Sequence, residues 1–377
     1  MPIHRGHTGK STAQRPTRGL RMHMVLAVTA LLTALLVVSG CSSSSGSHVV
    51  YVAGGLTSVA TYRINNGSGS VGNLVGSPYV AGNSPSSVVV HPSGQYVYVA
   101  NQADSTISLF TADPGNGTLT EVLPRTSGFG LSPAFMTMDV AGHFLFVANA
   151  VSNDVWAFSI GSGGVLTAVS SAPIGSAPGG LVLFNGFLIV PVPNFSDIAV
   201  VSVSNTGVLQ FVNSYPVTNG VGGIAVSSAA GGIVGGPPAG FVYATNPGTG
   251  TVSAFAIQPG GALQAMPGLT IGAGTTPVAA AVDSSGSFLY VANAGSANVS
   301  QYKVNLTTGA LTAFSTPTVA GGTNPVFMAT DPQGKFVYEG NTGAQSITEF
   351  SINSDGSLNN LNTISPGFVP RGFAASP

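Results

Sequence analysis

The chain is poor in cysteine and in charge. Its 377 residues include one cysteine, Cys41. Disulfides within the chain, cysteine metal sites, covalent haem and a cysteine nucleophile are therefore excluded. Charged residues make up only 6%, and no apolar run after residue 41 is long enough to span a bilayer. With 52 glycines and 25 prolines, this composition is too apolar for disorder and is typical of a rigid, turn-rich β protein.

The N-terminus carries half of the positive charge. One lysine and four arginines precede an apolar run, Met24 to Val38, which is followed by Val-Ser-Gly-Cys at 38–41. A basic segment, an apolar core and small residues before a cleavage point describe an export signal. We therefore predict a signal peptide over residues 1–40, the alternative being an uncleaved transmembrane anchor. In both cases the body of the protein lies outside the cytoplasm.

The Val-Ser-Gly-Cys stretch resembles the lipobox of bacterial lipoproteins. This resemblance implies that Cys41 is lipidated and becomes the new N-terminus, with residues 41–48 as a tether and the membrane contacted only through the lipid. Loss of the leader leaves five cations against eleven acids, a net charge of −6. Five scattered cations cannot follow a phosphate backbone, so we expect no nucleic-acid partner. We also expect the protein to be a monomer.

Three sequence marks recur seven times in the same order. The first is a strand ending in a small residue or Asn, such as Phe-Leu-Tyr-Val-Ala-Asn at 288–293, and the second is an alternating strand, such as 299–304. The third mark is a Gly-x-Leu/Val step, whose glycines are Gly69, Gly117, Gly164, Gly207, Gly261, Gly309 and Gly356. A period of 43 to 54 residues with about four short strands per copy matches the blade of a β-propeller.

The two ends of the body complement one another. Each complete copy has an apolar strand before its first mark, but the body begins at residue 48 directly on the first mark. The chain ends at 369–377 on such an apolar strand, with nothing after it. We therefore predict an all-β, seven-bladed propeller over residues 49–377, with four strands per blade. The C-terminal inner strand joins the N-terminal strands, which leaves no open sheet edge.

The segments 283–293, 298–312 and 331–341 resemble the lactonase family of seven-bladed propellers. Its members include 6-phosphogluconolactonases and cyclic-muconate lactonising enzymes, and the repeat is also similar to the Tyr-Val-Thr-Asn group. The resemblance covers residues 49–377. It implies hydrolysis of a sugar lactone in carbohydrate metabolism, without a cofactor, where the inner strands begin. Water must attack the lactone carbonyl, which requires a base and a group that stabilises the oxyanion.

The family places His and Arg at the starts of the middle inner strands. This chain has Gly179-Gly180 and Gly222-Gly223 there. Because glycine has no side chain that could transfer a proton, the catalytic residues cannot be assigned from the resemblance and are unknown. Two functions remain open. One is a lactonase-like hydrolase, and the other is a non-catalytic, envelope-anchored propeller that binds a glycan or a protein.

Two kinds of ligand-binding candidate remain. Arg371 is the one cation at the start of an inner strand, where it could contact an anion or oxyanion, or instead bond loop carbonyls at the closure. A set of asparagines ends the first-mark strands and could bind sugar hydroxyls, or instead satisfy the following turn. These are Asn101, Asn149, Asn246, Asn293 and Asn341.

Other ionisable residues carry weaker signals. Glu339 is interpreted as replacing the alanine of the Tyr-Val-Ala-Asn pattern, where burial could raise its pKa. His91 and His143 lie near turns on the opposite face, far apart in sequence and without nearby carboxylates, so no metal site is expected.

Overall fold

The structure is a computed structural model, and it describes residues 46–377 except 75, 114 and 230–238. Gly46 to Pro377 form one compact unit. Its regular elements are strands and three short 3-10 turns, η1 (Ser162–Gly164), η2 (Pro193–Phe195) and η3 (Pro267–Leu269). In this part of the chain, none of the helical segments has the length and apolar character needed to cross a membrane.

Each blade has an inner, a second, a third and an outer strand. The inner strands are β30 (Pro370–Ala375), β5 (Pro85–Val90), β9 (Pro133–Met138), β13 (Val182–Phe184), β17 (Ile224–Ser228), β22 (Pro277–Val282) and β26 (Pro325–Thr330). The second strands are β1 (Ser47–Gly54), β6 (Tyr96–Asn101), β10 (Phe144–Asn149), β14 (Phe187–Val192), β18 (Gly240–Asn246), β23 (Phe288–Asn293) and β27 (Phe336–Asn341).

The third and outer strands complete the blades. The third strands are β2 (Ser58–Asn65), β7 (Thr106–Ala112), β11 (Asp154–Ile160), β15 (Asp197–Val203), β19 (Thr251–Ile257), β24 (Asn298–Val304) and β28 (Ser346–Ile352). The outer strands are β8 (Leu119–Thr126), β12 (Leu166–Pro173), β16 (Leu209–Pro216), β25 (Leu311–Ala320) and β29 (Leu358–Ile364). In two blades the outer strand is broken into two pieces, β3 (Val71–Asn73) with β4 (Tyr79–Val80), and β20 (Leu263–Ala265) with β21 (Ile271–Gly272).

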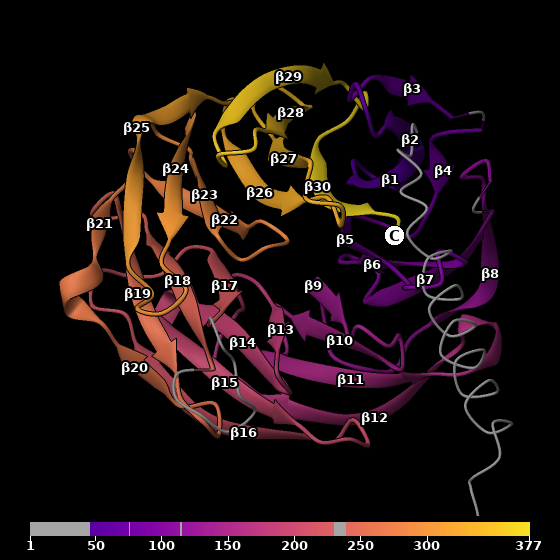
Figure 1. The fold of residues 1–377 in the computed structure, drawn as a ribbon. Helices are drawn as coiled ribbons and strands as arrows, with labels where there is room; N and C mark the ends of the chain where they lie inside the picture. Colours follow the sequence, from indigo (N-terminus) through magenta and orange to yellow (C-terminus); the bar gives the residue numbers. More distant parts are fainter. Residues whose placement is uncertain (1–45, 75, 114, 230–238) are drawn as a thin grey trace, which may run out of the picture. The chain divides into compact units, whose positions relative to one another are not determined.

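The seven sheets are arranged around a central axis, with their inner strands toward the middle (Figure 1). We number them as blades 1 to 7 in chain order, so that blade 1 contains β1 and blade 7 contains β26 to β29. The predicted closure is confirmed: β30 pairs with β1, from Val50 opposite Ala375 to Gly54 opposite Pro370. In Figure 1 the yellow β30 accordingly lies beside the indigo β1. Strand β1 begins at Ser47, two residues before the predicted start of the propeller.

The hydrophobic core is divided among the junctions between blades. Seven clusters of buried residues each draw on two adjacent blades. The cluster at the closure joins Val50 and Val52 of blade 1 to Tyr338 and Ile347 of blade 7. On the same junction the half-buried Phe373 of β30 stacks on Tyr338, with their ring centroids 4.4 Å apart. The ring is therefore held by contacts from each blade to the next.

The Gly-x-Leu mark has a packing cause. Gly309 and Gly356 have positive φ, and a Cβ on either would overlap an aromatic ring of the preceding blade, Phe241 or Phe288. Their carbonyls also accept hydrogen bonds from the buried hydroxyls of Tyr243 and Tyr290, at 3.1 and 2.8 Å. The same bond runs from Tyr98 of blade 2 to Gly164 of blade 3. We call this contact the tyrosine–glycine bond.

Candidate functional site

The candidate site lies at the face where the inner strands begin and the second strands end, which we call the mouth face. In five blades the inner strand starts with a proline opposite the last residue of the second strand, and the next residue is a β-bulge without a cross-strand partner. The bulged residues are Ser86, Ala134, Val278, Val326 and Arg371. Gly179 and Gly222 correspond to them in blades 4 and 5. Because bulges turn a side chain out of the sheet register, these seven positions set the chemistry of the mouth.

Arg371 is the one charged residue in this set. It is exposed, while Pro370 and Gly372 on either side are buried. Gly372 fits closely against the backbone of β5, where a Cβ would come within 2.8 Å of Ser87 Cα. The guanidinium makes no hydrogen bond or ion pair with any residue that the structure describes. A cation fixed at its backbone and free at its tip can contact an anion or a polarised carbonyl oxygen.

The glycines of blades 4 and 5 leave no space for the family's side chains. A Cβ on Gly179 would lie 2.7 Å from Pro193 Cγ. A Cβ on Gly222 would lie 2.8 Å from Thr245 Oγ1 and 3.0 Å from Pro247 Cγ. Distances this short require the neighbouring residues to move. The absence of His and Arg at these positions is therefore built into the surrounding packing.

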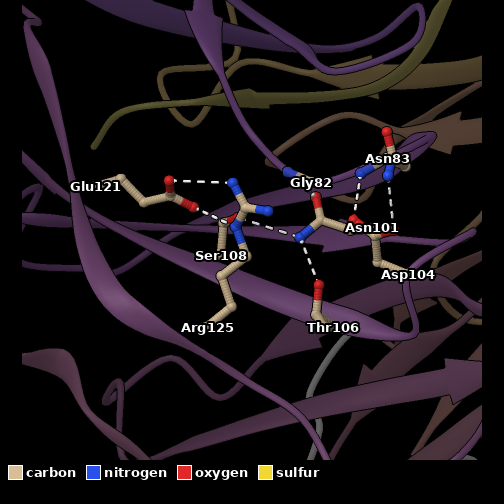
Figure 2. Close-up of polar contacts among 8 residues, drawn as sticks. All are labelled: Gly82, Asn83, Asn101, Asp104, Thr106, Ser108, Glu121 and Arg125. Carbon is tan, nitrogen blue, oxygen red and sulfur yellow. Dashed lines mark hydrogen bonds and ion pairs between the residues drawn. The ribbon is translucent and has the colours of Figure 1, made fainter.

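The five asparagines are fully buried at the ends of their strands. Figure 2 shows the arrangement in blade 2, where Asn101 Oδ1 accepts a hydrogen bond from the Gly82 N–H at 3.0 Å. Its Nδ2 donates to Thr106 Oγ1 and Ser108 Oγ. Asn293 of blade 6 likewise accepts from the Gly274 N–H and donates to the third strand. These amides join the loop that enters the inner strand to the third strand of the same blade.

The other three asparagines vary this arrangement. The amide of Asn246 contacts Thr251, Ser253 and the Gly220 carbonyl in the orientation that satisfies all of them. Asn149 donates to Asp154 at 2.8 Å, and Asn341 donates to Thr348 at 3.0 Å. The Oδ1 atoms of Asn149 and Asn341 are buried and have no hydrogen-bond partner in the part of the chain that the structure describes.

Glu339 explains the unpartnered oxygen in blade 7. Strand pairing places it at the position of Val99 and Val291, not at the alanine position expected from the sequence. It is fully buried, and its Oε2 accepts a hydrogen bond from the Gly322 N–H at 2.7 Å, so no described residue donates to Glu339 Oε1 or to Asn341 Oδ1. Burial raises the pKa of Glu339, although hydrogen bonding to the Gly322 N–H and to the Asn341 side chain opposes this. A proton on this carboxyl group would supply a missing donor.

The histidines lie away from the mouth. His91 and His143 are at turns on the opposite face, where His91 Nδ1 contacts Ser93 and His91 Nε2 contacts the Gly142 carbonyl. Within the described ranges, no group of three or more possible metal ligands comes together. Cys41 falls outside the described residues.

A polar cluster at the junction of blades 7 and 1 was not found from the sequence. Its centre is Tyr338, whose hydroxyl lies 3.3 Å from His48 Nε2, while His48 Nδ1 contacts Asn66 Oδ1 at 2.7 Å. Glu349 lies across the sheet from Tyr338 and accepts a hydrogen bond from Asn362 Nδ2 at 3.0 Å. All these residues except Asn362 are buried. We call this group the closure cluster.

Glu349 carries the clearest electrostatic signal of the cluster. Burial raises its pKa to about 7. Hydrogen bonding to Asn362 and Tyr338 lowers the pKa more weakly, and the negative charge of Asp331 raises it further. Its Oε1 has no hydrogen-bond partner among the described residues. The sequence could have pointed to Glu349, because the third-strand position that it occupies in blade 7 is not acidic in the other blades. The corresponding residues are Gln301, Ala254 and Leu109 in blades 6, 5 and 2.

Comparison with known families now identifies the fold family. The sequence profile described as "Lactonase, 7-bladed beta-propeller" matches residues 41–224 and 194–329. The chain belongs to the lactonase family of seven-bladed β-propellers. A search of curated protein sequences finds no significant match.

Solved structures show the same fold as this lactonase-family propeller. A proposed 6-phosphogluconolactonase from Bacteroides fragilis is 21% identical, with a TM-score of 0.72 over 89% of this chain and 99% of the other. The periplasmic gluconolactonase PpgL of Pseudomonas aeruginosa is 20% identical, with a TM-score of 0.70 over 88% and 99%. A Lactobacillus plantarum protein is 17% identical, with a TM-score of 0.73 over 88% and 100%. At these identities the likeness concerns the fold alone.

Proposed function

We propose that this lactonase-family propeller binds a sugar lactone or the corresponding sugar acid at its mouth without hydrolysing it, with Arg371 as the anchor. The observation that carries this proposal is the composition of the seven mouth positions. They supply one free cation, one hydroxyl and otherwise glycine or apolar side chains. A cation can hold a carboxylate or a polarised carbonyl, but it cannot act as the base that activates water.

The residues near the mouth support binding more than hydrolysis. Glu339 is a buried acid at the mouth-face end of β27, but it has no exposed surface and is bonded to the loop backbone. Gly179 and Gly222 exclude any side chain that could shuttle a proton. Two of the similar structures come from proteins described as lactonases, which supports a sugar lactone or sugar acid as the proposed ligand.

Hydrolysis of sugar lactones is the second candidate function. The free guanidinium of Arg371 favours it, because a cation beside the lactone carbonyl would stabilise the oxyanion while water attacks. Because a sugar lactone also hydrolyses slowly without an enzyme, such a hydrolase would need to accelerate the ring opening only modestly.

One pair of measurements separates the two functions. Titration calorimetry with gluconate and 6-phosphogluconate would measure binding, and pH-stat assays with gluconolactone would measure ring opening above the buffer rate. We expect binding that Arg371→Ala weakens by about tenfold or more, a loss of about 1.4 kcal/mol. The matched control is Arg125→Ala, which removes a cation at the outer strand of blade 2, where it pairs with Glu121.

The three possible results of these measurements distinguish the two functions. Binding without turnover supports the proposal. Turnover above the buffer rate that Arg371→Ala abolishes supports the hydrolase and overturns the binding role. The absence of both overturns the assignment of the mouth.

We further propose that the propeller is exported and held at a membrane by a lipid on Cys41, as the leader pattern predicts. Cys41→Ser should release the protein from the membrane fraction. An unchanged membrane association in that variant would contradict the lipid anchor.

A further inference from the structure

A cavity on the mouth face, between blades 5 and 6, is separate from the ring of bulged residues. It has a volume of about 420 Å³, within the ~300–1,000 Å³ range of small-molecule sites. Its walls are the β18–β19 loop of blade 5, the loop that enters β22, and the start of β24. None of its lining residues is charged. The polar lining consists of Thr249, Thr275, Thr276, Ser296 and Asn298.

A chain of hydrogen bonds fixes the orientation of Asn298. The Gly274 N–H donates to Asn293 Oδ1, so Asn293 Nδ2 must donate in turn to Asn298 Oδ1, at 2.9 Å. Ser296 Oγ also donates to Asn298 Oδ1, at 2.9 Å. With its oxygen held by two donors, Asn298 presents Nδ2 with no partner among the described residues. The hydroxyls of Thr275 and Thr276 have no such partner either.

The same positions are occupied differently in other blades. In blade 2, Asn83 and Asp104 stand in place of Thr275 and Ser296, and two bonds of 2.6 and 2.8 Å join them (Figure 2). In blade 3, Asp154 stands in place of Asn298. Its Oδ1 accepts the same two bonds, from Asn149 and Ser152, but its Oδ2 is taken by Trp156 Nε1 at 3.1 Å. Only the blade 6 version, among these three, leaves its polar groups open to a ligand.

We propose that this cavity binds a neutral polyhydroxylated ligand, namely a hexose unit of a saccharide. A charged ligand would lose its water without gaining a counter-charge, and an apolar ligand would leave the Asn298 amide unpaired. Sugar hydroxyls both donate and accept, so they match the amide and the two threonine hydroxyls. The apolar face of a sugar ring can rest on Pro247 and Ala273, which also line the cavity. The site goes beyond the mouth function and does not depend on Arg371.

The test uses the full chain in a detergent without a sugar head group. Maltose, cellobiose and chitobiose are titrated at millimolar concentrations, with binding followed by saturation-transfer NMR and calorimetry. We expect at least one of them to bind, and Asn298→Ala and Thr275→Val each to weaken binding by about tenfold, the effect of losing one well-placed hydrogen bond. Thr275→Val preserves the shape of the side chain and keeps the test valid if the alanine variant misfolds.

Two controls locate the site. Thr323→Val changes the residue of blade 7 that corresponds to Thr275, and Arg371→Ala changes the mouth, so neither should alter saccharide binding. Failure of all three saccharides to bind would overturn the proposal. Equal binding by wild type, Asn298→Ala and Thr275→Val would also overturn it.

Discussion

Replacing Glu349 by glutamine should remove much of the pH dependence of this protein's stability. In the folded chain the carboxyl group is buried in the closure cluster, where Oε2 accepts a hydrogen bond from Asn362 and the Tyr338 hydroxyl lies nearby. Burial raises its pKa from an ordinary 4.5 to about 7. Between these two values the folded state holds a proton that the unfolded state releases. The free energy of unfolding therefore falls as pH rises from 4.5 to 7, and levels off above that range.

The size of this effect follows from the shift itself. Each pKa unit corresponds to about 1.4 kcal/mol, so a rise from 4.5 to about 7 gives a loss of about 3 kcal/mol between pH 4.5 and pH 8. This is a large fraction of the ~5–15 kcal/mol that holds a typical domain folded. Glutamine should fit the site without strain, because Gln301 occupies the corresponding position in blade 6.

The assay is urea unfolding at several pH values, followed by the fluorescence of the one tryptophan, Trp156, which stacks on Phe158 in blade 3. We expect Glu349→Gln to match wild type near pH 5 and to exceed it in stability at pH 8. Glu121→Gln, which removes an outer-strand carboxylate, serves as the control and should keep the wild-type slope. If wild type and Glu349→Gln lose stability equally between pH 5 and pH 8, the buried proton is not on Glu349.

Two further predictions concern closure and the mouth. Ending the chain at Ser365 removes β30, which exposes the edge of β1 and deletes the Phe373 stack. It should cause aggregation or a loss of several kcal/mol, whereas a chain that starts at Gly46 should keep its melting temperature. A truncated chain that melts like wild type and remains monomeric would contradict the closure. Gly222→Arg should lower stability by about 1–3 kcal/mol, because its Cβ meets Thr245 and Pro247, and should create no lactonase activity. Thermal melting and the gluconolactone assay check both points, and a stable, active variant would contradict the packing argument.

The fold could be predicted because its sequence marks are themselves contacts between neighbouring blades. The glycine of each Gly-x-Leu step lies where a side chain of the neighbouring blade leaves no space for a Cβ. The side chain is an aromatic ring in most copies, as Phe241 is for Gly309, and it is aliphatic at Gly117, where Leu74 and Val49 lie. Such a requirement recurs in every copy, so it is visible without a structure. The closure was equally visible, since the missing inner strand of blade 1 had to come from the C-terminus.

The site was harder to predict because the relevant contacts are not periodic. The burial of Asn101 depends on a loop N–H from Gly82, and a sequence pattern alone could not decide between that bond and a sugar hydroxyl. The closure cluster joins Tyr338 to His48 across 290 residues. Glu339 was assigned one position away from its true register, because the strand ends in Glu-Gly-Asn where the copies that end at Asn101, Asn149 and Asn293 have Val-Ala-Asn.

The start of β1 and the end of β30 both lie on the face opposite the mouth, because second strands run toward the mouth and inner strands run away from it. The residues at these two ends, Ser47 and Ser376, even line one cavity there. Fixing a propeller that starts at Gly46 to a sensor chip or a bead, through either the start of β1 or the end of β30, would therefore leave Arg371 and the blade 5–6 cavity facing the solution. Soluble and immobilised protein should bind the same ligands with the same affinity, which makes surface-based screening of large saccharide collections practical.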